Sequence, residues 1–355
     1  MPPRDAPDEP IPPVDDSTRK SSGVQAGGTP PEGMKPSVLI VSPGLEHANN
    51  GNWQTARRWA GILAPHYEVE ISDGWYGSAP DLLIALHAHR SAEAIESFTA
   101  AYPGRPVVVV LTGTDVYRDI HRHPTAAHVL TLAQRLVVLQ PQAKFEIDPW
   151  LRHKVEVIYQ SAAFEARHEP RRDAFEIVCV GHLRREKDPI TLMQAAHRLP
   201  PTSMIRIVQI GRALDAEFER AAESAHGLHY TWIGELSHHA TRELIRRARA
   251  LVTTSRIEGG ANVIVEAVMS DVRVLASHIS GNLGMLGQDY DGYFSPGDPD
   301  DLARLLLRTE RDHAFRRHLK AQCHARRPLF EPERERDAVL HLIDSVLAHT
   351  QPTPA

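Results

Sequence analysis

The chain of 355 residues has only two cysteines, Cys179 and Cys323. This number excludes a disulfide framework and argues against a zinc site built on thiolates. Cys179 lies within the apolar run EIVCVG, where we expect a buried strand residue, and Cys323 stands alone near the end. A reducing cytoplasm is therefore the expected compartment.

Long apolar runs and an excess of positive charge are also missing. No run reaches the roughly 18 residues that cross a bilayer, and the N-terminus lacks the apolar core of a signal peptide. The formal net charge is −5, and the arginines are scattered along the chain. Nucleic-acid binding is therefore not expected, because no surplus of cations is available for phosphates. Stable membrane association is not expected either.

Residues 1–36 contain nine prolines and almost no apolar side chains. Such a segment cannot bury enough surface to offset its loss of conformational entropy, so we expect a disordered tail. Met34, just before the folded pattern begins, is an alternative start of translation. Residues 349–355 are expected to form a second disordered tail.

From Ser37 onward, short apolar runs alternate with amphipathic helical stretches. SVLIVS, DLLIALH and PVVVVLTG are each followed by a helical pattern, and the alternation restarts at FEIVCVG after the polar stretch QSAAFEARHEPRRDA. Runs of this kind predict parallel sheets buried on both faces. The sequence thus predicts an α/β fold with two doubly wound, Rossmann-like domains, residues 37–162 and 163–330, and a last helix over 331–348. Ligands of such sheets bind beyond the carboxyl ends of the strands, so the cleft between the domains is the expected site.

Polar residues follow the predicted strands of the first domain. Asn50, Gly51 and Asn52 precede a helix, where free N–H groups and the positive end of the helix dipole can bind an anion. A plain capped turn is the alternative. The predicted strands DLLIALH and PVVVVLTG end at the same edge of the sheet. The candidate residues at or just after their ends are His87, His89, Thr112, Gly113, Asp115 and Arg118.

The stretch RIEGGANVIVEAV in the second domain contains two glutamates in the pattern E-x7-E, Glu258 and Glu266. Gly259 and Gly260 allow the backbone to approach a ligand closely, and the helix start near Asn262 favours negative charge. Carboxylates accept hydrogen bonds from sugar hydroxyls, whereas N–H groups bind phosphates. This combination predicts a nucleotide-sugar site.

A cation-rich loop follows the strand FEIVCVG and contains Arg184 and Lys187. Arginine can bind two phosphate oxygens at once and lysine acts as a point charge, so the loop is a candidate phosphate clamp. A solvated run of charges is the alternative.

The stretch EAVMSDVRVLAS, with E-x7-E ahead of it, resembles a segment of the family 4 glycosyltransferases, which have the two-Rossmann GT-B architecture. The likeness continues upstream through YTWIGELSHHATRELIRRARALVTTS and downstream through GQDYDGYFSPGDPDDLARLL. It covers the second domain and, weakly, the first. The resemblance implies sugar transfer from a UDP-sugar without a metal or other cofactor, because cationic side chains and helix ends neutralise the departing diphosphate.

The resemblance also implies residue roles. Glu266 would hold the ribose hydroxyls, and Glu258 would contact the donor sugar. Lys187 matches the family lysine that binds the diphosphate, whereas His182 stands where the family usually has arginine, so we expect Arg184 to take over. The implied donor site comprises Gly51, Asn52, Arg184, Lys187, Glu258, Gly259, Gly260, Ala261, Asn262 and Glu266.

A narrower likeness rests on eight segments, among them NNGNWQTARRWAGIL, LIALHAHRSA and SHISGNLGMLGQDYDGYF, which look like those of the selenosugar synthases of selenoneine biosynthesis. It implies transfer of N-acetylglucosamine from a UDP-sugar to the selenium of selenophosphate, which a selenophosphate synthetase would supply. Thr112 replaces a histidine common in family 4, and an anionic selenium nucleophile needs no positioned base. The implied catalytic residues are His87, Thr112, Asp115 and Glu258. The implied acceptor-binding residues are Asn50, His87, His89, Thr112, Gly113, Arg118, Gly281 and Asn282.

Two other functions are compatible with the same sequence. One is an ordinary family 4 enzyme with a sugar, lipid or thiol acceptor. For a lipid acceptor, the stretch NWQTARRWAGIL with Trp53, Arg57, Arg58 and Trp59 would face a membrane. The other is a nucleotide-sugar epimerase or a non-catalytic binder, since E-x7-E serves donor binding in every case. The anomeric outcome, the donor sugar, the site of phosphate removal and the oligomeric state are not decided by the sequence.

Overall fold

The computed structural model describes residues 35–45 and 51–348. Most of the expected N-terminal tail, Asn50 and the expected tail at 349–355 lie outside the described residues.

The first half of the chain forms a six-stranded parallel sheet in the order β2-β1-β3-β4-β5-β6. Every residue of β3 and β4 is buried, as expected for a sheet covered by helices on both faces. The order of the strands changes direction between β1 and β3, which leaves a crevice beyond their carboxyl ends. The strands are β1 (Ser37–Val41), β2 (Glu68–Ser72), β3 (Leu82–Leu86), β4 (Val107–Leu111), β5 (Arg135–Val138) and β6 (Val155–Val157).

The helices of this half follow the strands in the predicted alternation. They are α1 (Gly51–Leu63), α2 (Ala92–Ala101), α3 (Ile120–Arg122) and α4 (Pro124–Leu132), with a π-helical turn η2 (Asp115–Asp119) and the 3-10 segments η3 (Pro141–Glu146) and η4 (Pro149–Lys154).

The second half forms another six-stranded parallel sheet, in the order β12-β11-β10-β7-β8-β9. Its direction changes between β10 and β7, so a second crevice opens beyond these two strands. The prediction of two doubly wound α/β domains is confirmed. The strands are β7 (Phe175–Val180), β8 (Ile205–Ile210), β9 (Tyr230–Trp232), β10 (Ala250–Thr253), β11 (Arg273–Ser277) and β12 (Tyr293–Phe294).

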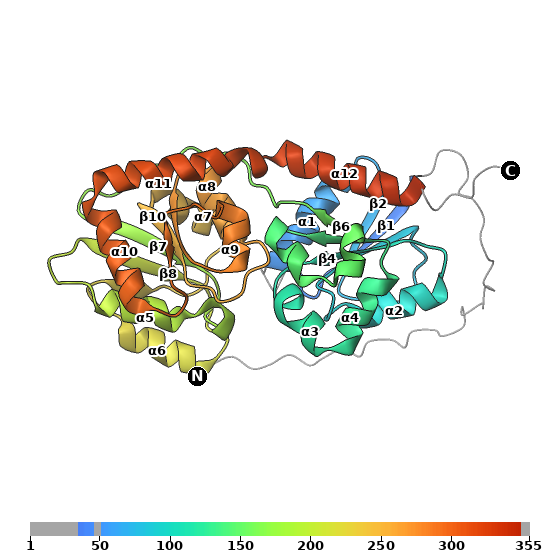
Figure 1. The fold of residues 1–355 in the computed structure, drawn as a ribbon, viewed down its shortest axis with the longest axis horizontal. Helices are drawn as coiled ribbons and strands as arrows, with labels where there is room; N and C mark the ends of the chain where they lie inside the picture. Colours follow the sequence, from blue (N-terminus) through green and yellow to red (C-terminus); the bar gives the residue numbers. More distant parts are fainter. Residues whose placement is uncertain (1–34, 46–50, 349–355) are drawn as a thin grey trace, which may run out of the picture. The chain divides into compact units, whose positions relative to one another are not determined.

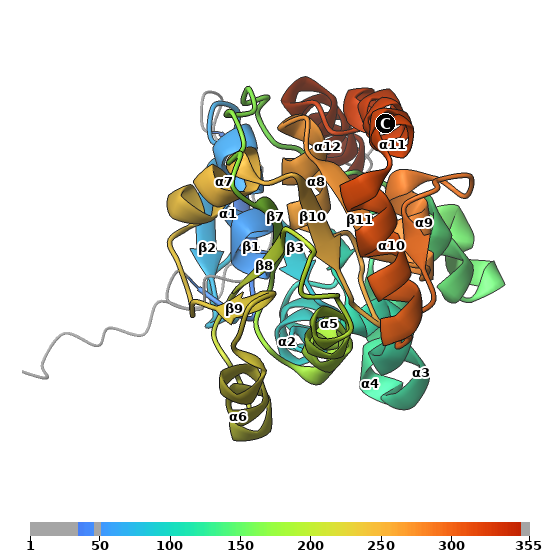
Figure 2. The same ribbon diagram turned by 90° about the vertical axis from the view of Figure 1, so that its left-hand side faces the viewer.

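Helices cover both faces of this second sheet. Figure 2 shows α7 and α8 above strands β7, β8 and β10, and α5 and α6 below them. Two helices, α9 and α11, were not anticipated, and α9 begins at the SGN stretch. The helices are α5 (Pro189–His197), α6 (Ala216–Ala225), α7 (His238–Arg247), α8 (Asn262–Met269), α9 (Ser280–Leu286), α10 (Pro299–Arg311) and α11 (His313–Arg326), with η5 (Arg185–Lys187) and η6 (Arg327–Leu329) as 3-10 turns.

The last helix, α12 (Pro332–Ala348), packs against the first half of the chain although it follows the second half (Figure 1). Val339, Leu342 and Ile343 belong to the same buried cluster as Trp59 and Leu63 of α1. The apolar face of α12 therefore completes the core on one face of the first sheet.

A buried carboxylate fixes the start of α12. Glu335 is 2% exposed and accepts hydrogen bonds from Trp59 Nε1 at 3.0 Å and Arg58 Nε at 2.6 Å. It also accepts from the backbone N–H of Ser161 at 2.9 Å and from its hydroxyl at 2.6 Å. Since Ser161 lies between β6 and β7, this one side chain connects α12, α1 and the segment that joins the two sheets.

The same contacts bear on the lipid-acceptor alternative. Trp59 is fully buried and Arg58 is paired with Glu335, so α1 directs both side chains inward rather than toward a membrane. Within the part of the chain that the structure describes, no helix has the length and apolar composition needed to cross a bilayer.

Replacing Glu335 with alanine should lower the free energy of unfolding by about 3–5 kcal/mol, because the substitution leaves Arg58 partly buried without its ion partner. Thermal and urea unfolding monitored by circular dichroism measure the effect. The matched control is Glu333→Ala, an exposed position on the same helix, which should change stability by less than about 0.5 kcal/mol. Equal effects of the two substitutions would contradict a connecting role for Glu335.

Candidate functional site

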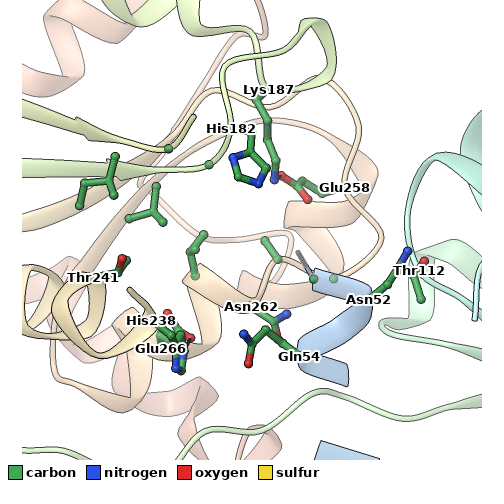
Figure 3. Close-up of a pocket in the computed structure, with 18 of the residues that line it drawn as sticks. Asn52, Gln54, Thr112, His182, Lys187, His238, Thr241, Glu258, Asn262 and Glu266 are labelled. Atoms are coloured by element: carbon green, nitrogen blue, oxygen red, sulfur yellow. Dashed lines mark hydrogen bonds and ion pairs between the residues drawn. The ribbon is translucent and has the colours of Figure 1, made fainter. Parts of the chain in front are cut away.

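A cavity of about 280 Å³ is lined by residues from both halves of the chain (Figure 3). The first half contributes the start of α1 and the loops after β3 and β4. The second half contributes the loops after β7, β8 and β10 and the start of α8. The cavity thus lies beyond the carboxyl ends of the strands and adjoins both points where strand order reverses, as the sequence analysis predicts.

The two glutamates of E-x7-E both line this cavity. Glu258 is 9% exposed and pairs with Lys187 Nζ, and its Oε1 also accepts a hydrogen bond from the Ser255 hydroxyl. Glu266 is 8% exposed, and its Oε1 lies 2.7 Å from His238 Nε2. Figure 3 shows both pairs, with Lys187 directed toward Glu258 and His238 lying against Glu266. Each carboxylate is therefore held in place before any ligand enters.

The sequence analysis did not single out His238 as a site residue. It is the first residue of α7, and the Ser237 hydroxyl caps this helix by accepting a hydrogen bond from Ala240 N. Its position in the sequence could have indicated a site residue. ELSHH follows strand β9 and therefore lies at the carboxyl edge of the second sheet.

The cation-rich loop after β7 also reaches the cavity, through His182, Arg184 and Lys187. Burial lowers the pKa of His182 below its ordinary value, and the neighbouring Arg212 lowers it further. His182 Nδ1 accepts a hydrogen bond from the backbone N–H of Arg212 at 3.2 Å. His182 is therefore neutral at neutral pH, and Arg184 and Lys187 supply the positive charge of this loop.

The glycine pair has a structural role that the sequence did not indicate. A Cβ atom at Gly259 would lie 2.3 Å from the carbonyl oxygen of Thr112, and one at Gly260 would lie 2.6 Å from Leu139 Cβ. The sequence analysis attributed these glycines to close approach by a ligand. In the structure, the close approach is to the first half of the chain, although Gly260 also lines the cavity, as do Ala261 and Asn262.

The wall from the first half includes Gly51, Asn52, His87, Thr112 and Thr114. His87 Nε2 lies 3.0 Å from Thr114 Oγ1 and 3.8 Å from Asp119 Oδ2. The backbone of His87 has a φ of 67°, a left-handed conformation that is unusual for a non-glycine residue. Burial lowers the pKa of His87, so the side chain is neutral at neutral pH.

Arg90 lines the same wall and is exposed. Among the described residues it forms no ion pair within 4 Å, in contrast to Lys187 opposite it. Arg90 follows His87 and His89 in the loop after β3 and therefore lies at the same edge of the first sheet.

Other predicted residues lie outside the cavity wall. Asp115 is completely buried and accepts hydrogen bonds from the backbone N–H groups of Ala88, Thr112 and Gly113, at 3.1, 3.1 and 2.7 Å. It therefore fixes the conformation of two loops that border the cavity. Arg118 is engaged with Asp119 and with Glu186.

His89 stacks on His123 at 4.1 Å between ring centroids. Asn282 is buried and donates to the Ser277 carbonyl oxygen at 2.9 Å. A Cβ atom at Gly281 would lie 1.9 Å from the Glu258 carbonyl oxygen, so this glycine packs against the loop that contains Glu258. Neither His89, Gly281 nor Asn282 lines the cavity.

A chain of polar and charged groups connects the two walls. Asp119 lies 3.8 Å from His87 Nε2 and accepts from Arg118 Nε at 2.8 Å. Arg118 Nη1 then donates to Glu186 Oε1 at 2.7 Å. Since Glu186 lies in η5 together with Lys187, this chain links the loop after β3 with the cationic loop after β7.

Residues 161–325 match the family model of the glycosyl transferases group 1. This part of the chain is therefore similar to the glycosyl transferases group 1. Glycosyltransferase 1 domain-containing protein 1 of Xenopus tropicalis is 26% identical over 191 residues, which are 52% of this chain and 52% of that protein. The chain thus matches about half the length of this relative.

Several solved structures share the fold. The Anabaena protein HepE in complex with UDP and glucose superposes with a TM-score of 0.70 at 15% identity, covering 87% of this chain and 100% of HepE. Sucrose-phosphate synthase from Thermosynechococcus elongatus superposes with a TM-score of 0.72 at 18% identity, covering 89% of this chain and 100% of the synthase. The expected GT-B architecture is confirmed by these similarities.

His87 should make the stability of the protein depend on pH. Because its folded-state pKa lies below the unfolded-state value of about 6.5, the unfolded chain gains a proton that the folded chain does not. The stability that neutral His87 contributes is present above about pH 6.5 and is lost as the pH falls. Asparagine tolerates the left-handed backbone at this position. The thermal unfolding midpoint of His87→Asn should therefore fall less than that of the wild type between about pH 7 and about pH 5.5. The control is His341→Asn on the exposed face of α12, and a wild-type pH profile in His87→Asn would contradict the prediction.

Proposed function

We propose, from the match of residues 161–325 to the glycosyl transferases group 1, that this protein transfers a sugar from a UDP-sugar donor. The observation that carries the proposal is the convergence of two buried carboxylates, Glu258 and Glu266, with Lys187 and Arg184 around one cavity. Carboxylates accept hydrogen bonds from vicinal hydroxyls, and cationic side chains bind phosphate oxygens. The two kinds of group match the two parts of a nucleotide sugar.

In this proposal Glu266 binds the ribose hydroxyls and Glu258 contacts the donor sugar. The N-terminus of α8 at Asn262 adds a positive dipole end on the same side of the cavity. Lys187 exchanges its bond with Glu258 for a bond with the diphosphate as the donor enters. Lys187 and Arg184 then stabilise the negative charge of departing UDP, and the proposal includes no metal or other cofactor.

For the acceptor we propose selenophosphate, and for the donor sugar N-acetylglucosamine. The wall from the first half supports an anionic acceptor, because Arg90 is a cation without an ion partner among the described residues and His87 is neutral. Thr112 cannot act as a general base at neutral pH, which suits a nucleophile that is already anionic.

The proposed reaction forms a bond between selenium and the anomeric carbon of the sugar. The bond from that carbon to the β-phosphate oxygen breaks, and UDP leaves with the electron pair. Transfer of the phosphoryl group from selenium to water then gives the selenosugar. A selenophosphate synthetase would supply the acceptor, as in selenoneine biosynthesis.

Glu266→Ala should lower the affinity for UDP by about ten- to a hundredfold, since hydrogen bonds to a charged group contribute about 1.5–3 kcal/mol. Isothermal titration calorimetry with UDP measures the change. The control is Glu219→Ala on α6, an exposed carboxylate of the same half, which should leave the affinity unchanged. Unchanged affinity in Glu266→Ala, or absence of UDP binding by the wild type, would refute the donor assignment.

Arg90→Gln should raise the KM for selenophosphate about tenfold or more while leaving the affinity for UDP within about twofold, because the lost contact is a charge-assisted bond to the acceptor. Mass spectrometry follows the product formed from UDP-N-acetylglucosamine and selenophosphate. The control is Arg122→Gln, an exposed arginine of the same half that does not line the cavity.

The same assay separates the alternatives. Turnover only with a sugar, lipid or thiol acceptor would leave the donor assignment intact and overturn the selenophosphate proposal. A new nucleotide sugar formed from UDP-N-acetylglucosamine alone would indicate an epimerase.

A further inference from the structure

Four arginines lie close together at the amino-terminal edge of the second sheet: Arg167, Arg249, Arg273 and Arg316. Arg249 directly precedes β10, and Arg273 is the first residue of β11. The guanidinium carbons of Arg249 and Arg316 lie 5.9 and 5.8 Å from the centre of the Phe175 ring, at the start of β7. We call these four residues the arginine cluster.

Backbone carbonyl oxygens hold the arginine cluster in place. Arg273 donates from Nε to the Arg316 carbonyl oxygen at 2.7 Å and from Nη1 to that of Arg249 at 3.3 Å. Arg167 Nη2 donates to the Ala248 carbonyl oxygen at 2.7 Å, and Arg316 Nη1 donates to that of Thr309 at 2.9 Å. These bonds fix the guanidinium groups, but carbonyl oxygens carry no net charge and leave the four positive charges unneutralised.

Two carboxylates, Asp271 and Asp312, lie near enough to act on the arginine cluster, but neither forms an ion pair with it. Within residues 35–45 and 51–348, no member of the arginine cluster forms an ion pair within 4 Å. Asp271 is near Arg167 but pairs with Arg327 at 2.6 Å and lies 3.8 Å from Lys320 Nζ. A chain with a net charge of −5 thus concentrates four unpaired cations in one place.

Two nitrogen atoms of the arginine cluster are buried without an acceptor. Nε of Arg167 and Nε of Arg249 have no hydrogen-bond partner in the described structure. An unsatisfied donor of a charged group is costly to bury. Burial, followed by the charges of Arg273 and Arg249, lowers the pKa of Arg167 to about 10. An oxyanion bound among these arginines would supply negative charge, and its oxygens could accept hydrogen bonds from these donors.

We propose that the arginine cluster is an anion site for a phosphate-type oxyanion, separate from the nucleotide-sugar cavity. Planar guanidinium groups suit a ligand with several oxygens and more than one negative charge, because each can donate two parallel bonds. The cavity follows the carboxyl end of β7 and the arginine cluster surrounds its amino end, so a strand roughly 20 Å long separates them. This inference goes beyond the proposed function and does not depend on it.

Calorimetric titration with inorganic phosphate in about 150 mM sodium chloride, where exposed charges are largely screened, tests the proposal. Arg249→Gln and Arg167→Gln should each weaken phosphate binding about tenfold or more. Arg304→Gln, an arginine of the same half that pairs with Asp301, should leave it unchanged. Lys187→Ala tests for phosphate binding in the cavity, which Lys187 lines. Phosphate binding at the arginine cluster should be unchanged by this substitution.

A conservative variant and the unfolding midpoint distinguish a loss of phosphate binding from a loss of folding. Arg249→Lys keeps the charge but not the planar fork, and it should bind phosphate with intermediate affinity. Phosphate should raise the unfolding midpoint of the wild type and of Lys187→Ala, and it should raise that of Arg249→Gln much less. Titration with glycerol 3-phosphate in parallel distinguishes a site for free phosphate from one for a phosphate ester.

Three results would overturn the proposal. One is equal phosphate binding by the wild type and Arg249→Gln. Another is loss of binding in Lys187→Ala, which would assign the anion to the cavity. The third is an absence of phosphate binding by the wild type, together with a loss of stability in Arg249→Gln that is the same with and without phosphate. The arginine cluster would then only stabilise the fold.

Discussion

The hydrogen bonds of buried Glu335 are the contacts on which the arrangement of the chain depends. Its carboxylate accepts from Arg58, Trp59 and Ser161, and thereby joins the last helix, the first helix and the segment between the sheets. A negative charge at 2% exposure is tolerated only because donors surround it. With α12 fixed on the first half, the carboxyl edges of the two sheets both contribute to one cavity, where each sheet reverses its strand order.

The walls of that cavity are organised before a ligand binds. Gly259 lies so close to the Thr112 carbonyl oxygen that any side chain would separate the loop between β10 and α8 from the first half. Glu258 and Glu266 are each held by a basic side chain, Lys187 and His238. Such pairing prevents two buried carboxylates from remaining unpaired, and it fixes their orientation before a ligand binds. The organisation of a binding site by its own ion pairs reduces the ordering cost of binding.

Much of this could be predicted from the sequence, because the relevant signals are local. Apolar runs of four to six residues fix the strands, and the loops that follow them lie at the carboxyl edge, which places Glu258 and Lys187 there. The E-x7-E pattern adds Glu266, on the helix that follows the loop of Glu258. The rest depends on packing between distant segments. That Asp115 binds three backbone N–H groups, and that Gly259 approaches Thr112, follows only from the positions of loops brought together by the fold. His238 was missed because it approaches Glu266 from another helix.

The distribution of charge around the cavity also explains why its two walls are not equivalent. Lys187 has a carboxylate partner, so the diphosphate of the proposed donor would replace an existing ion pair. Arg90 has none among the described residues, and an anion on that side gains its contact without breaking another. The chain from His87 through Asp119 and Arg118 to Glu186 connects the two walls. This chain holds the loop after β3 near the loop after β7 without any contribution from a ligand.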